Sequence, residues 1–495
     1  MSKGYKLIKI CYSPLEEGIK MIMQKNDHAK QRALSMGIRL ACIAAMLALL
    51  MVITLTSAKP VAYAKSGDWP TFLGNNARTG FNGAETIINP STAHNLKLHW
   101  TQTVKARISA EPVEANGMVY WGAWDGIEHA SRLSDGKDVW TANLGAISGN
   151  CIHLPHGVLS IATISTLKIG GVKTPVDFVG GGDENLYALN ANTGKIIWHT
   201  LLGGANSFLF SSPAVFGKSV YIGVASLGDC PLVQGTMQQV NAATGAIQHT
   251  FDVVPNGCIG GTVWGSPTVD SKTSTLYFGT GNEGTCSTNE TMTDAVVALR
   301  TTDLSLVGSW QVPSSQRVVD GDFGTTPTLF PATINGVLHQ MLGLMNKNGI
   351  YYAFDRTNIS AGPLWQDQLA APAMNGENNV SSSAWDGTAL YAAAALTTIK
   401  GTSCNGSLRA LNPADGTFLW QDCLSNTVLA PVTAVPGLAV TESGTSLMIV
   451  DATTGNHLFN YQDTNPSSNF SGPASISNGV LYQGNMDGKM YAFGP

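Results

Sequence analysis

The sequence is poor in charged residues. Only 12% of its 495 residues are Asp, Glu, Lys or Arg, and almost no stretch repeats apolar residues at the three- and four-residue spacing of an amphipathic helix. Few charges, together with 54 Gly and many Ser, Thr and Asn, favour an all-β protein over an α/β protein. A chain of this length holds two to four average domains or one large β domain.

An excess of basic residues is also lacking. The formal net charge is −5, and removal of residues 1–64, with nine basic and three acidic side chains, would leave −11. Because a surface that binds phosphates needs a basic face, we expect no nucleic acid partner. The motif Cys-x-x-Cys-His is absent, so we expect no c-type haem among the cofactors.

Only one long apolar run is present, at residues 40–55 (LACIAAMLALLMVITL). Basic residues precede it, and the nearest are Lys25, Lys30, Arg32 and Arg39. The small residues of Ala62-Tyr63-Ala64 follow it and offer a cleavage site. The pattern predicts a secretory signal within residues 1–64 and an exported mature protein, extracellular, periplasmic or on the cell surface, with no stable membrane span after cleavage. The alternative is an uncleaved membrane anchor, for which the run is short.

Cysteine is scarce, and six cysteines follow the predicted signal: Cys151, Cys230, Cys258, Cys286, Cys404 and Cys423. An even number in an oxidising compartment predicts disulfides. Proximity in sequence favours the pairs Cys404–Cys423 and Cys230–Cys258, which leaves Cys151–Cys286. The segment CIHLPH at 151–156 has metal-ligand residue types for zinc or copper, but a loop with one disulfide cysteine and two polar histidines is the more ordinary interpretation.

Glycine is abundant, and it recurs in one short phrase. Residues 189–198 read LNANTGKIIW, and residues 411–420 read LNPADGTFLW. Glycine tolerates the left-handed conformation of a tight hairpin turn, and Asp or Asn before it favours that turn. Seven copies or weaker copies end on Trp140, Trp198, His249, Trp310, Trp365, Trp420 and Phe459. We expect these tryptophans to have a structural role and to pack between repeats.

The segments upstream of these endings complete a four-stranded repeat. Residues 211–223, 265–279 and 471–484 each have the pattern of an innermost strand, a turn and a second strand. Repeats of this kind at intervals of 39 to 61 residues indicate a β-propeller. The last repeat stops at Pro495 without an ending, whereas LKLHW, which ends at Trp100, has no repeat before it.

We therefore expect an all-β fold in which residues 65–495 form a single domain. It is an eight-bladed β-propeller of four-stranded antiparallel blades, closed by an N-terminal strand that joins the C-terminal blade. Closure hides the sheet edges that a linear array of the same repeats would expose.

With eight such repeats, residues 68–495 resemble the quinoprotein alcohol dehydrogenase-like propellers that carry pyrroloquinoline quinone (PQQ) repeats. DWPTFLGNNARTGFN at 68–82 looks like the opening segment of that superfamily. Residues 263–282 and 322–330 look most like its polyvinyl-alcohol dehydrogenase branch. The resemblance implies a PQQ- and calcium-dependent dehydrogenase that oxidises a small or polymeric alcohol and passes electrons to a separate acceptor. The same repeat also builds non-catalytic propellers, so an extracytoplasmic scaffold that binds protein or polysaccharide is the alternative.

The resemblance also implies roles for individual residues. Trp264, which we expect to begin an innermost strand, matches the tryptophan on which PQQ stacks. Asn282 matches a calcium ligand, and Lys347 matches the residue that contacts the quinone oxygen. A core tryptophan and two ordinary turn residues are the structural alternatives. Where the enzymes place a calcium-binding Glu, the nearest carboxylate is Asp229, which we expect to be a metal ligand.

The general base is missing from its expected place. The Gly-Asp that supplies it in the family falls at Glu290-Thr291 in this sequence. Glu290 and Asp294 are therefore the candidate catalytic residues, with Glu283 close by. Asp294 could equally be a solvated residue at the start of a strand. Asp320 and Asp322 could face the axis of the propeller, although Asp before Phe-Gly is also common in turns.

Overall fold

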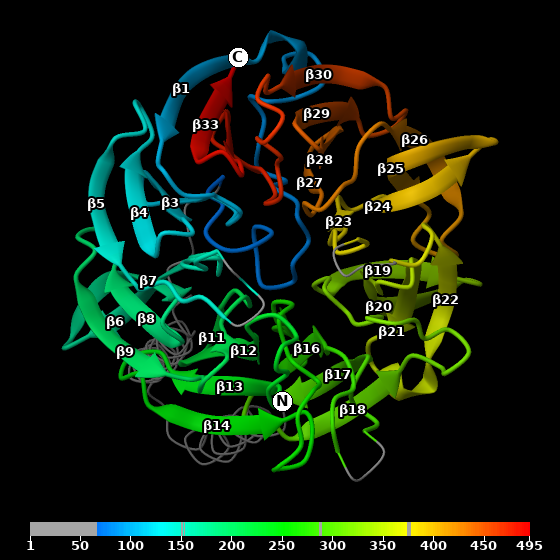
Figure 1. Cartoon of the computed structure of the whole chain (residues 1–495). Helices are drawn as coiled ribbons and strands as arrows, with labels where there is room; N and C mark the ends of the chain where they lie inside the picture. The colour runs from blue at the N-terminus through cyan, green and yellow to red at the C-terminus, as the bar shows by residue number, and fades with distance from the viewer. Residues whose placement is uncertain (1–66, 150–151, 153, 287–289, 374–377) are drawn as a thin grey trace, which may run out of the picture. The chain divides into compact units, whose positions relative to one another are not determined.

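Eight antiparallel sheets follow one another along the chain and form a closed ring (Figure 1). The computed structural model describes residues 67–149, 152, 154–286, 290–373 and 378–495, so the predicted signal at 1–64 lies outside the described residues. The described helices are two single 3-10 turns, η1 (Ala93–Asn95) and η2 (Ile359–Ala361). Among these residues, no helix has the length and apolar character that a membrane crossing needs.

The first four blades run from the innermost to the outermost strand in chain order. Blade 1 consists of β2 (Val113–Ala115), β3 (Met118–Gly122), β4 (Ile127–Arg132) and β5 (Asp138–Asn143). Blade 2 consists of β6 (Thr163–Ile169), β7 (Val172–Gly180), β8 (Asn185–Asn190) and β9 (Ile196–Leu201). Blade 3 consists of β11 (Ala214–Phe216), β12 (Ser219–Ser226), β13 (Thr236–Asn241) and β14 (Ile247–Asp252), with a short β10 (Ser207–Phe208) paired to β12. Blade 4 consists of β15 (Thr268–Asp270), β16 (Thr275–Gly279), β17 (Ala295–Arg300) and β18 (Leu306–Gln311).

The other four blades complete the ring. Blade 5 consists of β19 (Thr328–Ile334), β20 (Val337–Met345), β21 (Ile350–Asp355) and β22 (Pro363–Gln368). Blade 6 consists of β23 (Ala384–Trp385), β24 (Leu390–Ile399), β25 (Thr402–Leu411) and β26 (Phe418–Leu424). Blade 7 consists of β27 (Thr433–Val435), β28 (Leu438–Ser443), β29 (Ser446–Asp451) and β30 (His457–Gln462). Blade 8 consists of β31 (Ser475–Ser477), β32 (Val480–Gly484), β33 (Lys489–Gly494) and β1 (Lys97–Thr103).

Blade 8 joins the two ends of the domain. Strand β1 pairs antiparallel with β33, and Trp100 lies opposite Ala492. Figure 1 shows β1 in blue beside β33 in red. The predicted closure is confirmed, and each of the eight predicted repeat endings lies on the outermost strand of its blade.

The repeated phrase forms the contact between successive blades. The indole nitrogen of Trp140 on blade 1 donates a hydrogen bond to the carbonyl oxygen of Ala191 on blade 2 at 2.8 Å. A Cβ atom added to Gly194 in the same turn would lie 2.6 Å from the Trp140 ring. Only glycine therefore lets the turn approach the ring so closely. The same contact joins Trp100 to Gly136, Trp198 to Gly245, Trp365 to Gly416 and Trp420 to Gly455.

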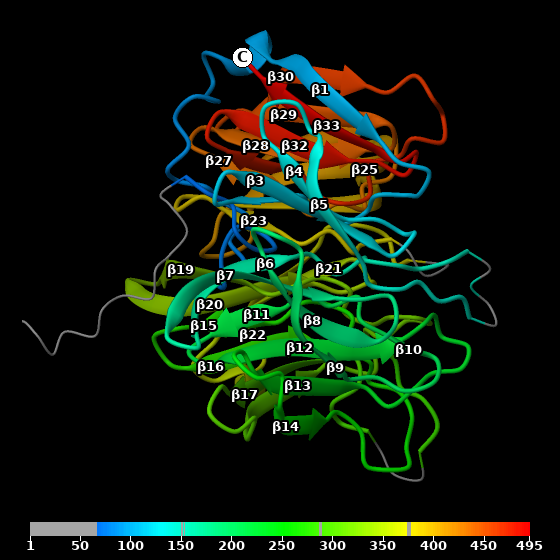
Figure 2. The ribbon, with the colours of Figure 1, turned by 90° about the vertical axis from the view of Figure 1, so that its left-hand side faces the viewer.

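An N-terminal segment, residues 69–82, crosses the middle of the ring, and we call it the axial segment. In Figure 1 it is the dark blue trace at the centre, and in Figure 2 it lies toward the left-hand face. Its hydrogen bonds reach the innermost strands, or the residues that lead into and out of them, of all eight blades. The bonded pairs are Trp69–Glu114, Pro70–Ile164, Asn76–Val215, Asn76–Val269, Ala77–Leu329, Thr79–Trp385, Gly80–Ala434 and Asn82–Ile476.

Arg78 anchors the axial segment from within. Its side chain is fully buried and donates hydrogen bonds to the carbonyl oxygens of Pro267, at 3.0 Å, and Pro213, at 3.1 Å. Burial lowers the pKa of the guanidinium to about 9, against the opposing charge of Glu111. One buried cation thus bonds the entry segments of blades 3 and 4 to the axial segment.

We predict that Arg78→Met strongly destabilises the fold. The substitution leaves several buried carbonyl oxygens without a donor, and each such loss costs about 1–3 kcal/mol. Urea unfolding followed by circular dichroism measures the change. The matched control is Arg132→Met, because Arg132 is half exposed and paired only with Asp135. Equal unfolding midpoints for the two variants would contradict the anchoring role of Arg78.

Candidate functional site

Trp264 lies in the loop that enters blade 4, four residues before β15 begins at Thr268. The expectation that it begins an innermost strand is therefore wrong, because the β15–β16 pairing starts only at Thr268. Its indole nitrogen donates to Oδ2 of Asp322 at 2.9 Å. Gly324 lies against the other end of the ring, where an added Cβ would be 2.0 Å from Trp264. The indole is thus fixed in position by one carboxylate and one glycine.

Lys347 lies beside this ring. It belongs to the turn between β20 and β21, and its Nζ is 5.2 Å from the centre of the Trp264 ring. The same atom is 3.0 Å from Oδ1 of Asp320 and 2.7 Å from Oδ1 of Asp322. Burial alone would lower the pKa of Lys347, but the charges and hydrogen bonds of Asp322 and Asp320 outweigh burial and raise it. The lysine therefore stays charged beside an aromatic face.

Asp320 and Asp322 both point into the site from residues 312–327, the connection between β18 and β19. Asp322 is buried, and burial raises its pKa to about 6 in spite of the charge of Lys347. Asp320 is more open, with a quarter of its side chain exposed. It adopts φ of +55°, a left-handed conformation that is uncommon outside glycine. The sequence suggested an axial position for these two residues without assigning either a role, and the Asp-Gly-Asp spacing was the signal available.

The side chains of Asn282 and Asp229 lie beside Asp320, and each has oxygen atoms of the kind that bind metal ions. The side-chain nitrogen of Asn282 donates to Oδ1 of Asp320 at 2.8 Å. Asn282 also hydrogen-bonds the carboxylate of Asp229, whose pKa is raised by burial and by the charge of Asp320. Carboxylate and amide oxygens are the ligands that hard cations such as Ca²⁺ prefer. The donor set therefore fits a hard cation.

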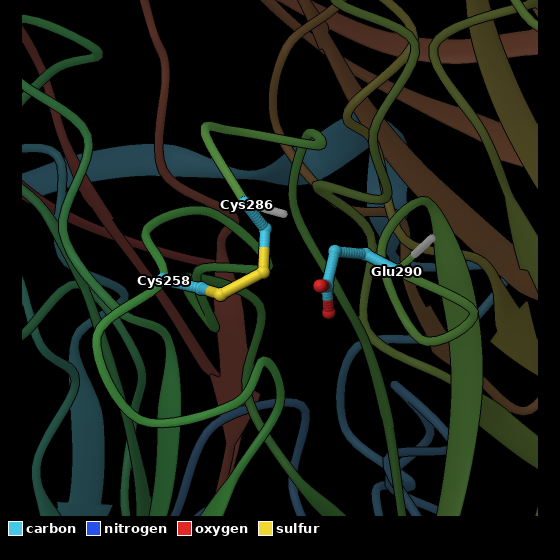
Figure 3. A group of neighbouring side chains, drawn as sticks. All are labelled: Cys258, Cys286 and Glu290. Atoms are coloured by element: carbon cyan, nitrogen blue, oxygen red, sulfur yellow. A yellow bond between two sulfur atoms is a disulfide. The ribbon is translucent and has the colours of Figure 1, made fainter. Parts of the chain in front are cut away.

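The two predicted catalytic carboxylates lie in different surroundings. Asp294, just before β17, is buried, and its Oδ1 has no hydrogen-bond partner among the described residues. Burial raises its pKa to about 7, and the charge of Asp322 adds to the shift. Glu290 instead lies beside the disulfide Cys258–Cys286, and its carboxylate is within 4.8 Å of both sulfur atoms (Figure 3). A disulfide offers no thiolate, so these three residues are not a metal site as they stand.

Of the six predicted site residues, the structure gathers Asp229, Trp264, Asn282, Asp294 and Lys347 around Asp320 and Asp322, and it sets Glu290 apart. Below them, a cavity of about 190 Å³ is lined by Trp264, by Phe72 of the axial segment and by hydroxyl residues such as Ser212 and Ser266. The cavity connects the site to the axial segment.

The disulfide expectations need correction. Cys404–Cys423 is confirmed. Cys258 pairs with Cys286, so the expected pairs Cys230–Cys258 and Cys151–Cys286 are wrong. An antiparallel bridge between Gly260 and Glu283 brings the two segments together, and separation along the chain does not reveal such a bridge. Cys230 is disulfide-bonded as well, and Cys151 lies outside the described residues.

The segment at 151–156 offers one described histidine, His156. Its Nδ1 is 2.9 Å from the carbonyl oxygen of Leu154, and its ring packs on Trp124 with centres 4.4 Å apart. Burial lowers the pKa of His156. These contacts fit the ordinary loop interpretation, and His153 lies outside the described residues.

Comparison with known proteins gives one family and several relatives. A family model described as outer membrane protein assembly factor BamB, of the PQQ_2 type, matches residues 129–322 and 347–495. The quinohemoprotein alcohol dehydrogenase of Comamonas testosteroni is 26% identical over 344 residues, which cover 60% of this chain and 46% of the relative. The polyvinylalcohol dehydrogenase of Sphingopyxis sp. is 23% identical over 338 residues, 59% of this chain and 49% of the relative. The chain thus spans about half the length of these relatives.

Solved structures agree on the fold. The crystal structure of the Comamonas testosteroni enzyme superposes with a TM-score of 0.69 at 19% identity, covering 88% of this chain and 81% of the other. A europium-containing methanol dehydrogenase gives a TM-score of 0.70 at 15% identity, covering 87% of this chain and 98% of the other. At these identities the likeness shows the fold alone.

We predict that Gly324→Ala displaces the Trp264 ring, because the new methyl group would overlap the indole. In a crystal structure of the variant, the distance from the ring to Lys347 Nζ should exceed 5.2 Å, and near-ultraviolet circular dichroism should change. Gly204→Ala is the control, since an added Cβ there meets nothing within 4 Å. An unmoved indole in the Gly324 variant would contradict the contact.

Proposed function

The chain belongs to the PQQ_2 repeat family, and on this premise we propose that it is an exported dehydrogenase that uses PQQ and a hard cation to oxidise an alcohol. The observation that carries the proposal is the cluster around Trp264, in which a buried lysine and several carboxylates meet an aromatic face. Buried charges with shifted pKa values in a cleft are typical of functional sites. A propeller that only binds other proteins has no need of them.

The residues present fit the cofactor. The flat face of Trp264, fixed by Asp322 and Gly324, would support the planar quinone, and Lys347 would pair with its oxygen atoms. Bound PQQ would supply an electrophilic carbonyl that accepts hydride from the alcohol. Lys347 is held charged by Asp320 and Asp322, so it can stabilise negative charge that develops beside the ring.

The residues also fit a cation. Asp229, Asn282 and Asp320 offer oxygen atoms from three separate loops. Calcium suits such a donor set, and a lanthanide ion is the alternative because it is also a hard cation. The presence of a europium-containing enzyme among the structures of the same fold supports a test of both.

For the general base, the geometry favours Asp320 over the residues expected from the sequence. Asp320 is open to the site, and Lys347 and Asn282 both contact its Oδ1, so Oδ2 is the atom that would take the proton while the carboxylate faces the cation. Asp294 is buried, with a pKa of about 7, so it is the second candidate. Glu290 faces the disulfide and stays a weaker proposal.

Export and a separate electron acceptor complete the proposal. All five cysteines among the described residues are disulfide-bonded, which supports an oxidising compartment. The 495 residues contain no Cys-x-x-Cys-His, so electrons would leave to another protein or a small carrier. The alternative function, a protein- or polysaccharide-binding scaffold, is supported by the BamB description of the family model.

We predict that the purified protein binds PQQ in the presence of Ca²⁺ or La³⁺, and that Trp264→Ala and Lys347→Met each weaken uptake about tenfold or more. Quinone absorbance after gel filtration measures uptake, and dye reduction with primary and polymeric alcohols measures activity. Lys489→Met is the matched control, because Lys489 also pairs with two aspartates after a turn but lies in blade 8. Absence of uptake by the wild-type protein with either ion would favour the scaffold.

We predict that Asp320→Asn lowers kcat by about 100-fold or more, since general base catalysis contributes roughly that factor. Asp294→Asn should have the smaller effect. Single-turnover reduction of the loaded protein by alcohol separates chemistry from uptake. The reverse order of the two variants would assign the base to Asp294.

A further inference from the structure

Three loop segments outside the blades form a small sheet beside the site. We call residues 233–235, 259–262 and 281–285 the site sheet. Gly260 bridges Gln234 in parallel and Glu283 in antiparallel fashion. Backbone hydrogen bonds join its segments: Gly260 N to Val233 O at 2.9 Å, Gly235 N to Gly260 O at 3.0 Å, Gly261 N to Asn282 O at 2.8 Å, Ile259 N to Thr285 O at 3.3 Å and Gly281 N to Thr262 O at 2.7 Å.

Each segment of the site sheet carries or adjoins a residue of the proposed site. Asn282 lies within the third segment, and Trp264 follows the second by two residues. Asp229 precedes the first by four residues. The register of the site sheet therefore fixes the distance between the proposed stacking surface and the proposed cation ligands.

The site sheet is held by isolated bridges and these backbone hydrogen bonds, without the continuous ladder of a blade. Its segments are rich in glycine, including Gly260 and Gly261, which both adopt positive φ. An added Cβ at Gly260 would lie 2.5 Å from the backbone nitrogen of Gly284. The close approach requires glycine, but glycine also loses the most conformational freedom on folding. A cross-link adds a covalent constraint to the hydrogen bonds that hold this register.

We propose that the disulfide Cys258–Cys286 is a positioning pair that holds the site sheet in register and thereby sets the affinity of the site for its cation. The inference rests on the proposed function. Cys258 precedes the second segment, Cys286 follows the third, and their Cα atoms are 4.8 Å apart. Glu290 packs against the pair, as Figure 3 shows.

Opening the disulfide removes the covalent link between the segment that leads to Trp264 and the segment that carries Asn282. Reduction by dithiothreitol breaks the sulfur–sulfur bond, leaves two cysteine thiols and converts the reagent to its cyclic disulfide. The two electrons and two protons come from the reagent. The cation ligands then lose their fixed spacing, so cation affinity falls while the blades, which do not depend on this link, stay folded.

The second disulfide provides a matched control. Cys404–Cys423 joins β25 to β26 in blade 6, where a full ladder of strand pairing already holds the two segments. Its cysteines are 19 residues apart, against 28 for Cys258–Cys286. Its removal takes away a comparable cross-link at a distance from the site.

The experiment measures Tb³⁺ binding by emission sensitised through tryptophan, without added PQQ. The proteins are the wild type, Cys258→Ser with Cys286→Ser, and Cys404→Ser with Cys423→Ser. We expect the first double variant to bind Tb³⁺ about tenfold more weakly or worse, the range seen when residues that orient metal ligands are lost. The blade 6 variant should bind as the wild type does. Asp229→Asn should also weaken binding, which locates the ion at the site.

Each result decides a separate point. Equal affinity of the wild type and the Cys258/Cys286 variant would overturn the positioning role and leave the proposed function intact. Absence of sensitised emission from the wild type would overturn the inference, and the separate test of PQQ uptake would decide the proposed function. If the variant fails to fold, the wild type is titrated during gradual reduction, with the open disulfide identified by mass spectrometry. Affinity that stays constant after Cys258–Cys286 has opened would then overturn the inference.

Discussion

The contact on which the ring depends is that of an aromatic side chain on one blade with the turn glycine of the next. In the five pairs named above, such as Trp140 with Gly194, the indole also donates to a carbonyl oxygen of that turn. The contact is absent between blades where one of its two partners is replaced. The turn of blade 4 has Leu304 at positive φ in place of glycine, and blade 3 ends on His249. In blade 8 the strands β33 and β1 come from opposite ends of the domain and are not joined by a turn, and blade 7 ends on Phe459, which packs on Phe493. The tryptophan at the end of a blade is thus replaced, by His249 or Phe459, where the next blade lacks the turn glycine.

Eight similar blades cannot by themselves make one site, so the site depends on what departs from the repeat. Its residues come from loops of blades 3, 4 and 5, and the axial segment crosses the ring and forms hydrogen bonds with every blade. Trp264, from a loop of blade 4, and Phe72, from the axial segment, line the same cavity. The site loops and the axial segment therefore meet there. The scaffold supplies a rigid frame, and its loops supply the chemistry.

The sequence predicted the fold well because the evidence for it is periodic. The phrase that ends at Trp100 without a preceding repeat was enough to predict the pairing of β1 with β33. The site is different. Trp264, Asn282 and Lys347 were found through family resemblance, whereas the pairing of Cys258 with Cys286 depends on isolated bridges between glycine-rich loops, which leave no pattern in the sequence. The place of Asp320 depends on a loop conformation at positive φ, which local sequence does not specify.

The electrostatics of the site point to what completes it. Asp229, Asp294 and Asp322 all have pKa values raised by burial, and Lys347 is the cation that contacts the cluster directly. Arg317 lies at its edge, 3.9 Å from Glu283. A group of carboxylates that outnumbers its cations and is removed from water is costly unless protons or a metal ion compensate the charge. A bound hard cation would lower these pKa values together, because it would replace the missing solvent and oppose the mutual repulsion. The ligand loops would then be stabilised by the ion, and the covalent link between the loop of Asn282 and the segment that leads to Trp264 would decide how much of that stabilisation is available for binding.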